Sequence, residues 1–389
     1  MNAGRTMTSV GIVQTIIPIY RQPVFAELAG RDGIDLTLYA KLGASEGSLA
    51  GTGAVDDYST VNITERTVGP FIWDPGTLQA ARARHDVLIF SWKTRSLLLP
   101  RAIRVARRNG SAVVVWGHGF SKNESPMRTR MRMKAAHMAD ACLLYDPVTA
   151  RKLGNQGIEP QRTFAAPNAV DQDGVESAKA HWLDHPGKLQ AFQQRERIDP
   201  GKTIIFISRI EPDKRLELLI EAMKHILTDE PEMTLVVVGD GSARASAESH
   251  ARALGVADSI RFLGAVYDEK ELAGWCLSSL CMAYPVAVGL SVMHAFGYGL
   301  PVITSNDISA HNPEINAIRD GENGVLYQDG NARDFARILL ELSQKPPLRA
   351  RMSQAALDSV RGDTGWTIQN MVNGFIECIE AVQTMKKAH

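Results

Sequence analysis

The sequence lacks the features that would indicate a membrane-spanning, disulfide-linked or metal-binding protein. No apolar run approaches the roughly 20 residues needed to cross a bilayer. Residues 7–20 resemble a signal peptide, but Pro18 interrupts them and no small-residue cleavage site follows, which favours a first strand. The four cysteines form no C-x-x-C pair, have no histidine cluster beside them, and lie in apolar stretches. We therefore expect a reducing compartment, the cytoplasm.

Net charge is also lacking, since 43 Lys and Arg residues balance 43 Asp and Glu residues. The balance is uneven along the chain: residues 1–171 carry 21 basic and 14 acidic residues, and the remainder carries the opposite excess. This segregation indicates that one half of the chain meets an anionic partner.

Short apolar runs alternate with helical stretches along the whole chain. This alternation is typical of parallel sheets that are covered by helices on both faces. The predicted strands of the first half span residues 10–17, 35–39, 86–92, 112–116 and 141–145. Those of the second half span residues 203–207, 234–238, 260–263, 280–283 and 301–304. The chain therefore repeats one α/β architecture twice.

A polar segment, residues 172–200, separates the two halves and has no clear periodicity before residue 190. We interpret it as a linker and predict two doubly wound, Rossmann-like domains that face each other across a deep cleft. The acceptor-side domain would comprise residues 1–185 and the nucleotide-sugar-binding domain residues 186–365. A final helix, about residues 366–389, is expected to pack back near the first domain.

Two segments of the second half have the pattern of an anion site. The strand that ends at Ser208 is followed by Arg209 and Lys214 and then by a helix, and two cations beside a helix N-terminus suit a diphosphate. Taken alone, that loop would be interpreted as a solvated one, and the neighbouring segments favour the anion site instead. After the strand that ends near Pro285, a loop of small residues leads through Gly289 into another helix, whose amides would be exposed to a ligand.

These segments occur in a recognisable order. A strand with Arg-x-x-x-x-Lys is followed by V-V-G-D-G, by F-L-G, by G-L-x-x-x-H-A-F-x-x-G-x-P-V, and then by P-E and D-G-x-N-G. This order resembles the retaining GT-B glycosyltransferases of sequence family four, the glycosyl transferases group 1, most closely from residue 203 to residue 327. Upstream, Trp116-Gly-His-Gly is similar to the histidine loop of that family.

The resemblance implies a role for each matching residue. Arg209 and Lys214 would neutralise the departing donor diphosphate, and His118 would contact the donor sugar from the first domain. The remaining donor-binding residues would be Gly264, Ala265 and Val266 beside the base, Gly289, Leu290 and Ser291 at the sugar and distal phosphate, and His294 at the ribose. The chain departs from the family at Val286 and His294, where the family carries two glutamates. An imidazole can still bond a ribose hydroxyl, whereas Val286 cannot bond the donor sugar through its side chain.

A metal-free reaction with retention is expected, and no cofactor besides the donor. The only D-x-D is Asp171-Gln-Asp173, beside the linker and thus poorly placed for a catalytic metal. The two cations and the helix dipole would stabilise the leaving diphosphate instead. The acceptor would be a glycan or a lipid diphosphate of surface polysaccharide synthesis, by analogy alone. A nucleotide-sugar epimerase and a non-catalytic partner of the same fold are the alternatives.

A basic segment between Arg101 and Lys134 has nine cations and a single acidic residue, Glu124. Ser125-Pro126 is a typical helix start, after which Arg128, Arg130, Arg132 and Lys134 flank an apolar face. A basic amphipathic helix suits an anionic membrane surface, on the inner face of the membrane, or a lipid-diphosphate acceptor. A core-packing helix with solvated arginines is an equal alternative. Nucleic acid is not expected, because no aromatic residues interleave the cations.

Overall fold

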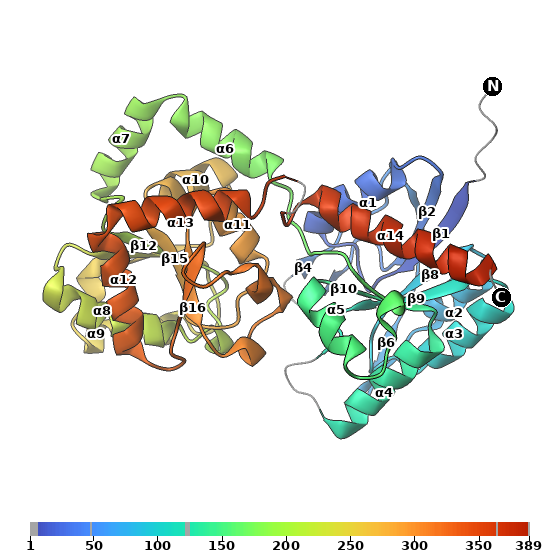
Figure 1. The fold of residues 1–389 in the computed structure, drawn as a ribbon. Coiled ribbons are helices and arrows are strands. Elements are labelled where there is room, and N and C mark those ends of the chain that lie inside the picture. The colour runs from blue at the N-terminus through green and yellow to red at the C-terminus, as the bar shows by residue number, and fades with distance from the viewer. Residues whose placement is uncertain (1–6, 47–48, 121–124, 363–364, 388–389) are drawn as a thin grey trace. The chain divides into compact units, whose positions relative to one another are not determined.

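The computed structural model describes residues 7–46, 49–120, 125–362 and 365–387 and divides the chain into two compact units (Figure 1). The first unit comprises Met1–Ala169 and Ile368–His389, and the second comprises Val170–Thr367. Each unit is an α/β fold around a parallel sheet, as the alternating pattern predicts. None of the described helices is long and apolar enough to cross a membrane.

The sheet of the first unit has seven parallel strands in the order β11-β10-β9-β8-β1-β2-β5. Its central strands are continuous apolar runs because helices cover both of their faces. β9, for example, is buried along its whole length. The strands are β1 (Thr8–Val13), β2 (Ile34–Ala40), β5 (Ser59–Asn62), β8 (Val87–Ser91), β9 (Ala112–Gly117), β10 (Ala141–Leu144) and β11 (Thr163–Ala165).

Two hydrophobic clusters occupy the two faces of this sheet. One cluster joins the sheet to α1 (Gln22–Ala29) and to the last helix, α14 (Ile368–Lys387), which lies beside α1 in Figure 1. The other cluster joins the opposite face to the remaining helices. These are α2 (Pro75–Arg82), α3 (Leu99–Arg108), α4 (Pro126–Met138) and α5 (Pro147–Gly154).

The predicted start of α4 is confirmed, because the Ser125 hydroxyl accepts a hydrogen bond from the Arg128 N–H. The predicted distribution of the cations around α4 is wrong at one position. Arg132 is only 8% exposed, and its carbonyl accepts a hydrogen bond from the Trp92 indole. Its side chain is therefore part of the interior rather than of a basic surface.

The second unit has a six-stranded parallel sheet in the order β14-β13-β12-β15-β16-β17. The strand order reverses between β12 and β15, and ligands of open α/β sheets bind where the order reverses. The strands are β12 (Thr203–Ile207), β13 (Thr234–Val238), β14 (Ile260–Gly264), β15 (Cys281–Tyr284), β16 (Val302–Ser305) and β17 (Gly324–Tyr327). The helices that cover it include α8 (Leu216–Asp229), α9 (Arg244–Ala253), α10 (Glu269–Leu277), α11 (Ser291–Gly297), α12 (Ala332–Gln344) and α13 (Pro346–Asp358).

The polar segment interpreted as a linker instead forms two helices of the second unit, α6 (Asp173–Leu183) and α7 (Pro186–Glu196). Only a few of its side chains are buried, among them Val175 and Phe192, so the hydrophobic periodicity is weak. The Trp182 indole also donates a hydrogen bond of 2.6 Å to the Lys270 carbonyl of α10. The units accordingly divide at residues 169 and 170, before α6, and not at residue 185.

Candidate functional site

The loops that follow β12 and β15 meet at the point where the strand order of the second sheet reverses. Lys214 ends the β12 loop in a short 3₁₀ turn, and its Nζ donates a hydrogen bond of 3.0 Å to the Ala287 carbonyl of the β15 loop. The Ser208 hydroxyl also lies 2.5 Å from the Tyr284 hydroxyl. Two segments with the pattern of an anion site are therefore joined by direct contacts.

The two predicted cations differ in their surroundings. The Lys214 side chain is only 12% exposed and lies against the Tyr284 ring, with Asp213 3.5 Å from its ammonium group. Arg209 is exposed at the carboxyl end of β12. An ammonium group has three donors, so the single bond to Ala287 leaves Lys214 able to bind a phosphate oxygen as well.

The Gly-Asp-Gly turn after β13 packs against the backbone of the loop that carries Arg209. A Cβ at position 239 would lie 1.8 Å from the Ser208 carbonyl oxygen, and one at position 241 would lie 2.4 Å from the Ile210 carbonyl oxygen. Both glycines also adopt positive φ angles. Backbone packing explains why both positions are glycines.

The β15 loop is held in an unusual backbone conformation by hydrogen bonds. Ala287 has φ +60°, a left-handed value that is uncommon outside glycine. Lys214 bonds its carbonyl, and the buried Tyr327 hydroxyl donates a bond of 2.7 Å to the Pro285 carbonyl. The next amide, Val288 N–H, donates a bond of 3.2 Å to Nδ1 of His311. The loop is thus fixed before any ligand arrives.

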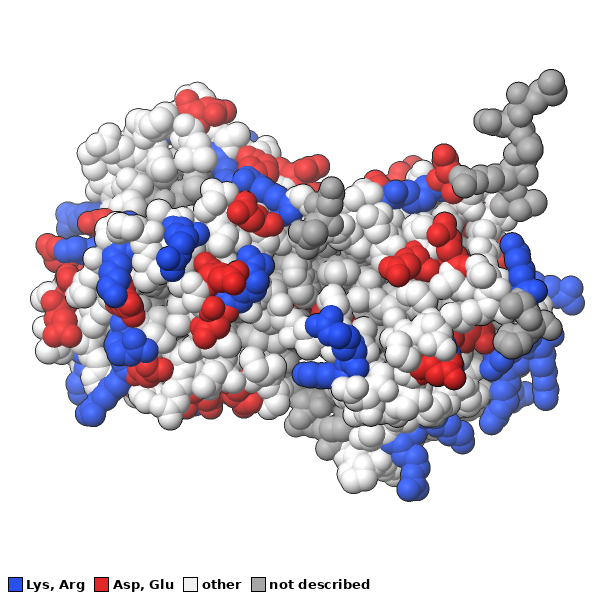
Figure 2. All heavy atoms as spheres, viewed as in Figure 1, with Lys and Arg blue, Asp and Glu red and all other residues white. Residues whose placement is uncertain are grey.

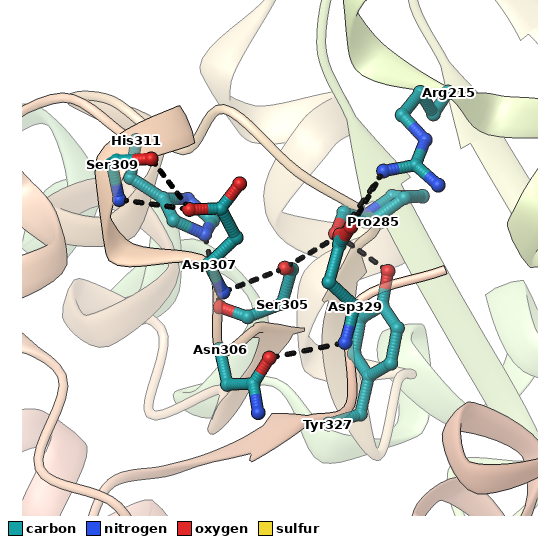
Figure 3. Close-up of polar contacts among 9 residues, drawn as sticks. All are labelled: Arg215, Pro285, Ser305, Asn306, Asp307, Ser309, His311, Tyr327 and Asp329. Carbon is teal, nitrogen blue, oxygen red and sulfur yellow. Dashed lines mark hydrogen bonds and ion pairs between the residues drawn. The ribbon is translucent and has the colours of Figure 1, made fainter. Parts of the chain in front are cut away.

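His311 joins this loop to the end of β16, where it lies near Ser305 (Figure 3). Because Nδ1 accepts from the Val288 amide, the ring is neutral and Nε2 donates to the Ser305 carbonyl at 2.9 Å. The Ser305 hydroxyl in turn donates to Asp329, whose carboxylate pairs with Arg215 at 3.0 Å. Arg215 directly follows Lys214, so one network connects both loops of the site.

His294 lies one turn into α11, where the family carries a glutamate. Its Nε2 is 2.7 Å from an Oε1 atom of Glu269, the first residue of α10, and the Tyr298 hydroxyl donates to the same oxygen. Burial alone would raise the pKa of Glu269, but the hydrogen bonds from His294 and Tyr298 hold that pKa below its usual value. A carboxylate from another helix therefore stands beside the position at which the sequence lacks one.

The other predicted donor-binding residues occupy the ends of β14 and β15. Gly264 ends β14 with φ +80°, and Ala265 and Val266 follow in the loop before α10. Gly289 and Leu290 lead into α11, which begins at Ser291 as expected.

His118 belongs to the other unit. It is exposed directly after β9, and its ring packs against Tyr145 with the centroids 4.8 Å apart. The Tyr145 hydroxyl accepts a hydrogen bond from the buried Arg21, which stacks on Trp116. The structure thus brings Arg209, Lys214 and the β15 loop together within one unit. In the other unit, His118 packs against the buried Tyr145 ring.

Sequence reasoning missed Glu269, His311 and Tyr327 as members of this site. Glu269 and His294 are 25 positions apart, and His311 and Val288 are 23 apart, so no local spacing links them. One signal was present for His311, which stands just before the Pro-Glu of the family pattern.

Among the described residues, no three His, Cys, Asp or Glu side chains gather as metal ligands. The absence of a metal from the reaction stays a prediction.

Comparison with known proteins supports the observed fold, and a family model matches within the second unit. Residues 188–358 match the family model described as glycosyl transferases group 1. A D-inositol 3-phosphate glycosyltransferase of Kribbella flavida is 28% identical over 270 residues, which are 62% of each chain. A phosphatidyl-myo-inositol mannosyltransferase of Mycobacterium leprae is 28% identical over 54% of this chain and 50% of its own length. The chain thus aligns with less than two thirds of either relative.

Similarity to solved structures extends over nearly the whole chain. The crystal structure of Anabaena Alr3699/HepE in complex with UDP has a TM-score of 0.71 at 15% identity, and it covers 96% of this chain and 100% of its own. At that identity the comparison establishes the fold alone. Residues 188–358, which lie within the second unit, thus match the glycosyl transferases group 1, and the chain has the two-domain GT-B fold.

Proposed function

We propose that this chain is a glycosyltransferase that moves a sugar from a UDP- or GDP-sugar to a glycan or lipid-linked acceptor, without a metal and with retention. The contact between Lys214 and Ala287 carries the proposal, because it joins a cation to a fixed backbone loop where α/β sheets bind ligands. UDP in the related Anabaena structure supports a nucleoside diphosphate as the leaving group.

The chemistry follows from the charge that develops as the sugar leaves. Cleavage of the bond between sugar and diphosphate puts negative charge on the departing phosphate, and groups that bind this charge lower the barrier. Lys214 and Arg209 would bind this charge. His118 would hold the donor sugar from the first unit, while the acceptor hydroxyl attacks on the face that the diphosphate leaves. A lipid-linked acceptor would bring the protein to the inner face of a membrane, as its basic helix suggests.

Titration of UDP, GDP and ADP into the purified protein, followed by calorimetry in the presence of a chelator, tests the proposal. We expect one of the three nucleotides to bind tightly without a divalent metal. If none of them binds, the replacement of the family glutamates has removed the site, and a non-catalytic partner becomes the better description. If binding or sugar transfer requires added manganese, the metal-free part of the proposal is wrong.

An epimerase on the same fold is the second enzyme candidate. It would release free nucleotide and an altered sugar without any acceptor, whereas a transferase leaves the sugar on an acceptor. Analysis of the sugar product with and without cell-envelope glycolipid as acceptor separates the two. Epimerised sugar in the absence of acceptor would reject the transferase.

A matched pair of His311 variants tests whether the fixed β15 loop contributes to nucleotide binding. In His311→Asn the amide oxygen can replace Nδ1 as the acceptor for the Val288 N–H, whereas in His311→Gln the longer side chain reaches toward Ser305 instead. A buried amide without an acceptor costs about 1–3 kcal/mol, so we expect His311→Gln to weaken nucleotide binding about tenfold. His311→Asn should bind within about threefold of the wild type. Equal affinities for the two variants would show that the contact with Val288 has no role in binding.

A further inference from the structure

Two neighbouring helices of the first unit present basic stripes to solvent. On α3, Arg101, Arg104 and Arg108 recur at helical spacing, and all three are exposed. The opposite face of α3 is buried in the core. No carboxylate among the residues that the structure describes forms an ion pair with these three arginines, whereas the nearby Arg107 pairs with Asp140 at 3.3 Å. The stripe on α3 therefore keeps its full charge.

α4 repeats the arrangement. Arg130, Lys134 and His137 are exposed at the same helical spacing, and α4 contains no acidic residue, nor does α3. α3 follows β8 and α4 follows β9, two adjacent parallel strands, and both helices pack on the same face of the sheet. The two stripes accordingly run in the same direction. Figure 2 shows Lys and Arg side chains gathered over this part of the first unit.

Each stripe begins with an exposed apolar side chain. Leu97, just before α3, is 43% exposed, and Met127 in the first turn of α4 is 64% exposed. Between the start of α3 and the middle of α4 lies a pocket of about 130 Å³, whose lining includes Leu99, Met131 and Lys134. Apolar side chains at one end of a cationic surface are typical of proteins that insert into the headgroup region of a bilayer. A solvated face or a nucleic-acid surface does not need them.

We propose that this α3–α4 face, defined by Leu97, Arg101, Arg104, Arg108, Met127, Arg130 and Lys134, docks on an anionic lipid bilayer. The basic stripes bind the headgroups, and Leu97 and Met127 enter the boundary with the acyl chains. The face differs from the one expected from the sequence, because Arg132 is buried and α3 supplies three of the five cations. The inference rests on the proposed function only in its choice of a membrane as partner.

Sedimentation of the full chain with vesicles tests this inference. We expect binding to equimolar phosphatidylcholine and phosphatidylglycerol, and none to phosphatidylcholine alone. The double variant Arg101→Glu and Arg104→Glu should lower the partition coefficient by roughly tenfold or more. A second double variant, Arg130→Glu and Lys134→Glu, should have a similar effect. As a control, Lys224→Glu and Arg252→Glu make the same charge change at exposed positions of the second unit and should leave binding intact.

One outcome would support the inference, and three would overturn it. Loss of vesicle binding in both helix variants, with nucleotide binding and melting temperature unchanged, supports it. An equal loss in the Lys224 and Arg252 control overturns it, because net charge would then suffice. Wild-type affinity in both helix variants also overturns it, as does binding to duplex DNA without binding to anionic vesicles. Since vesicle and nucleotide binding are measured separately, failure here is distinct from failure of the proposed function.

Discussion

Lys214→Ala is expected to reduce nucleoside diphosphate affinity at least about 100-fold, more than any other single substitution in the β12 loop. Two losses combine at this residue. The ammonium group that would bind the phosphate is removed, and the Ala287 carbonyl loses its donor inside a largely buried loop. Each loss is worth about 1–3 kcal/mol, and 1.4 kcal/mol is a factor of ten. Calorimetric titration with the nucleotide that binds the wild type measures the effect.

Two further variants separate these contributions. Arg209→Ala removes an exposed charge without altering a described hydrogen bond, so its effect should be smaller, about tenfold. Lys224→Ala removes an exposed lysine from α8, outside the site, and should have none. Wild-type affinity in Lys214→Ala would contradict the placement of the diphosphate beside the β15 loop. If Lys214→Ala lowers the affinity no more than Arg209→Ala does, the hydrogen bond from Lys214 to the Ala287 carbonyl has no role in binding.

Gly374→Ala is expected to lower the free energy of unfolding of the first unit by about 3 kcal/mol. Gly374 lies in α14, where a Cβ would stand 2.2 Å from the Ala165 carbonyl oxygen of β11. Because the obstructing atom belongs to the backbone of a strand, the helix itself must move. Its movement would loosen Met371 and Phe375, which are fully buried against the sheet. Denaturant unfolding followed by intrinsic fluorescence reports this loss.

The same substitution elsewhere provides the control. Gly187 lies in α7, and nothing stands within 4 Å of the position that a Cβ would occupy. Gly187→Ala should therefore be neutral or stabilising by up to about 1 kcal/mol, since alanine favours the helix. If Gly374→Ala is as stable as Gly187→Ala, α14 does not pack against β11 as closely as described.

Central strands could be predicted from the sequence, whereas three of the four edge strands of the two parallel sheets could not. Residues 112–116 and 234–238 each contain three consecutive valines, and they form β9 and β13 almost residue for residue. In the two parallel sheets the strands that were missed are β5, β11 and β17, which lie at the edges and are short and partly exposed. Half-exposed edge strands need no continuous apolar run, so composition gives them no distinctive pattern.

In the candidate site, too, contacts within one motif could be predicted from the sequence, whereas contacts between distant segments could not. Arg209 and Lys214 belong to one motif, so their proximity follows from the loop between a strand and a helix. The contact between Lys214 and Ala287 joins residues 73 positions apart, and the pair of His294 and Glu269 joins two helices. The packing of separate elements determines such contacts. The sequence shows which residue types the site has lost, while only the fold shows which neighbours stand beside them.

The path of the chain has a consequence for biosynthesis. The second unit is one continuous segment, Val170–Thr367, but the first unit needs α14, which is synthesised after the second unit is complete. On the ribosome, domains generally fold in the order in which they emerge. Here the first unit is completed last, because the sheet formed by the first 169 residues keeps the part of one apolar face that α14 covers exposed until α14 has left the exit tunnel. A nascent chain of this protein therefore carries an unfinished amino-terminal unit while the whole second unit, Val170–Thr367, is synthesised.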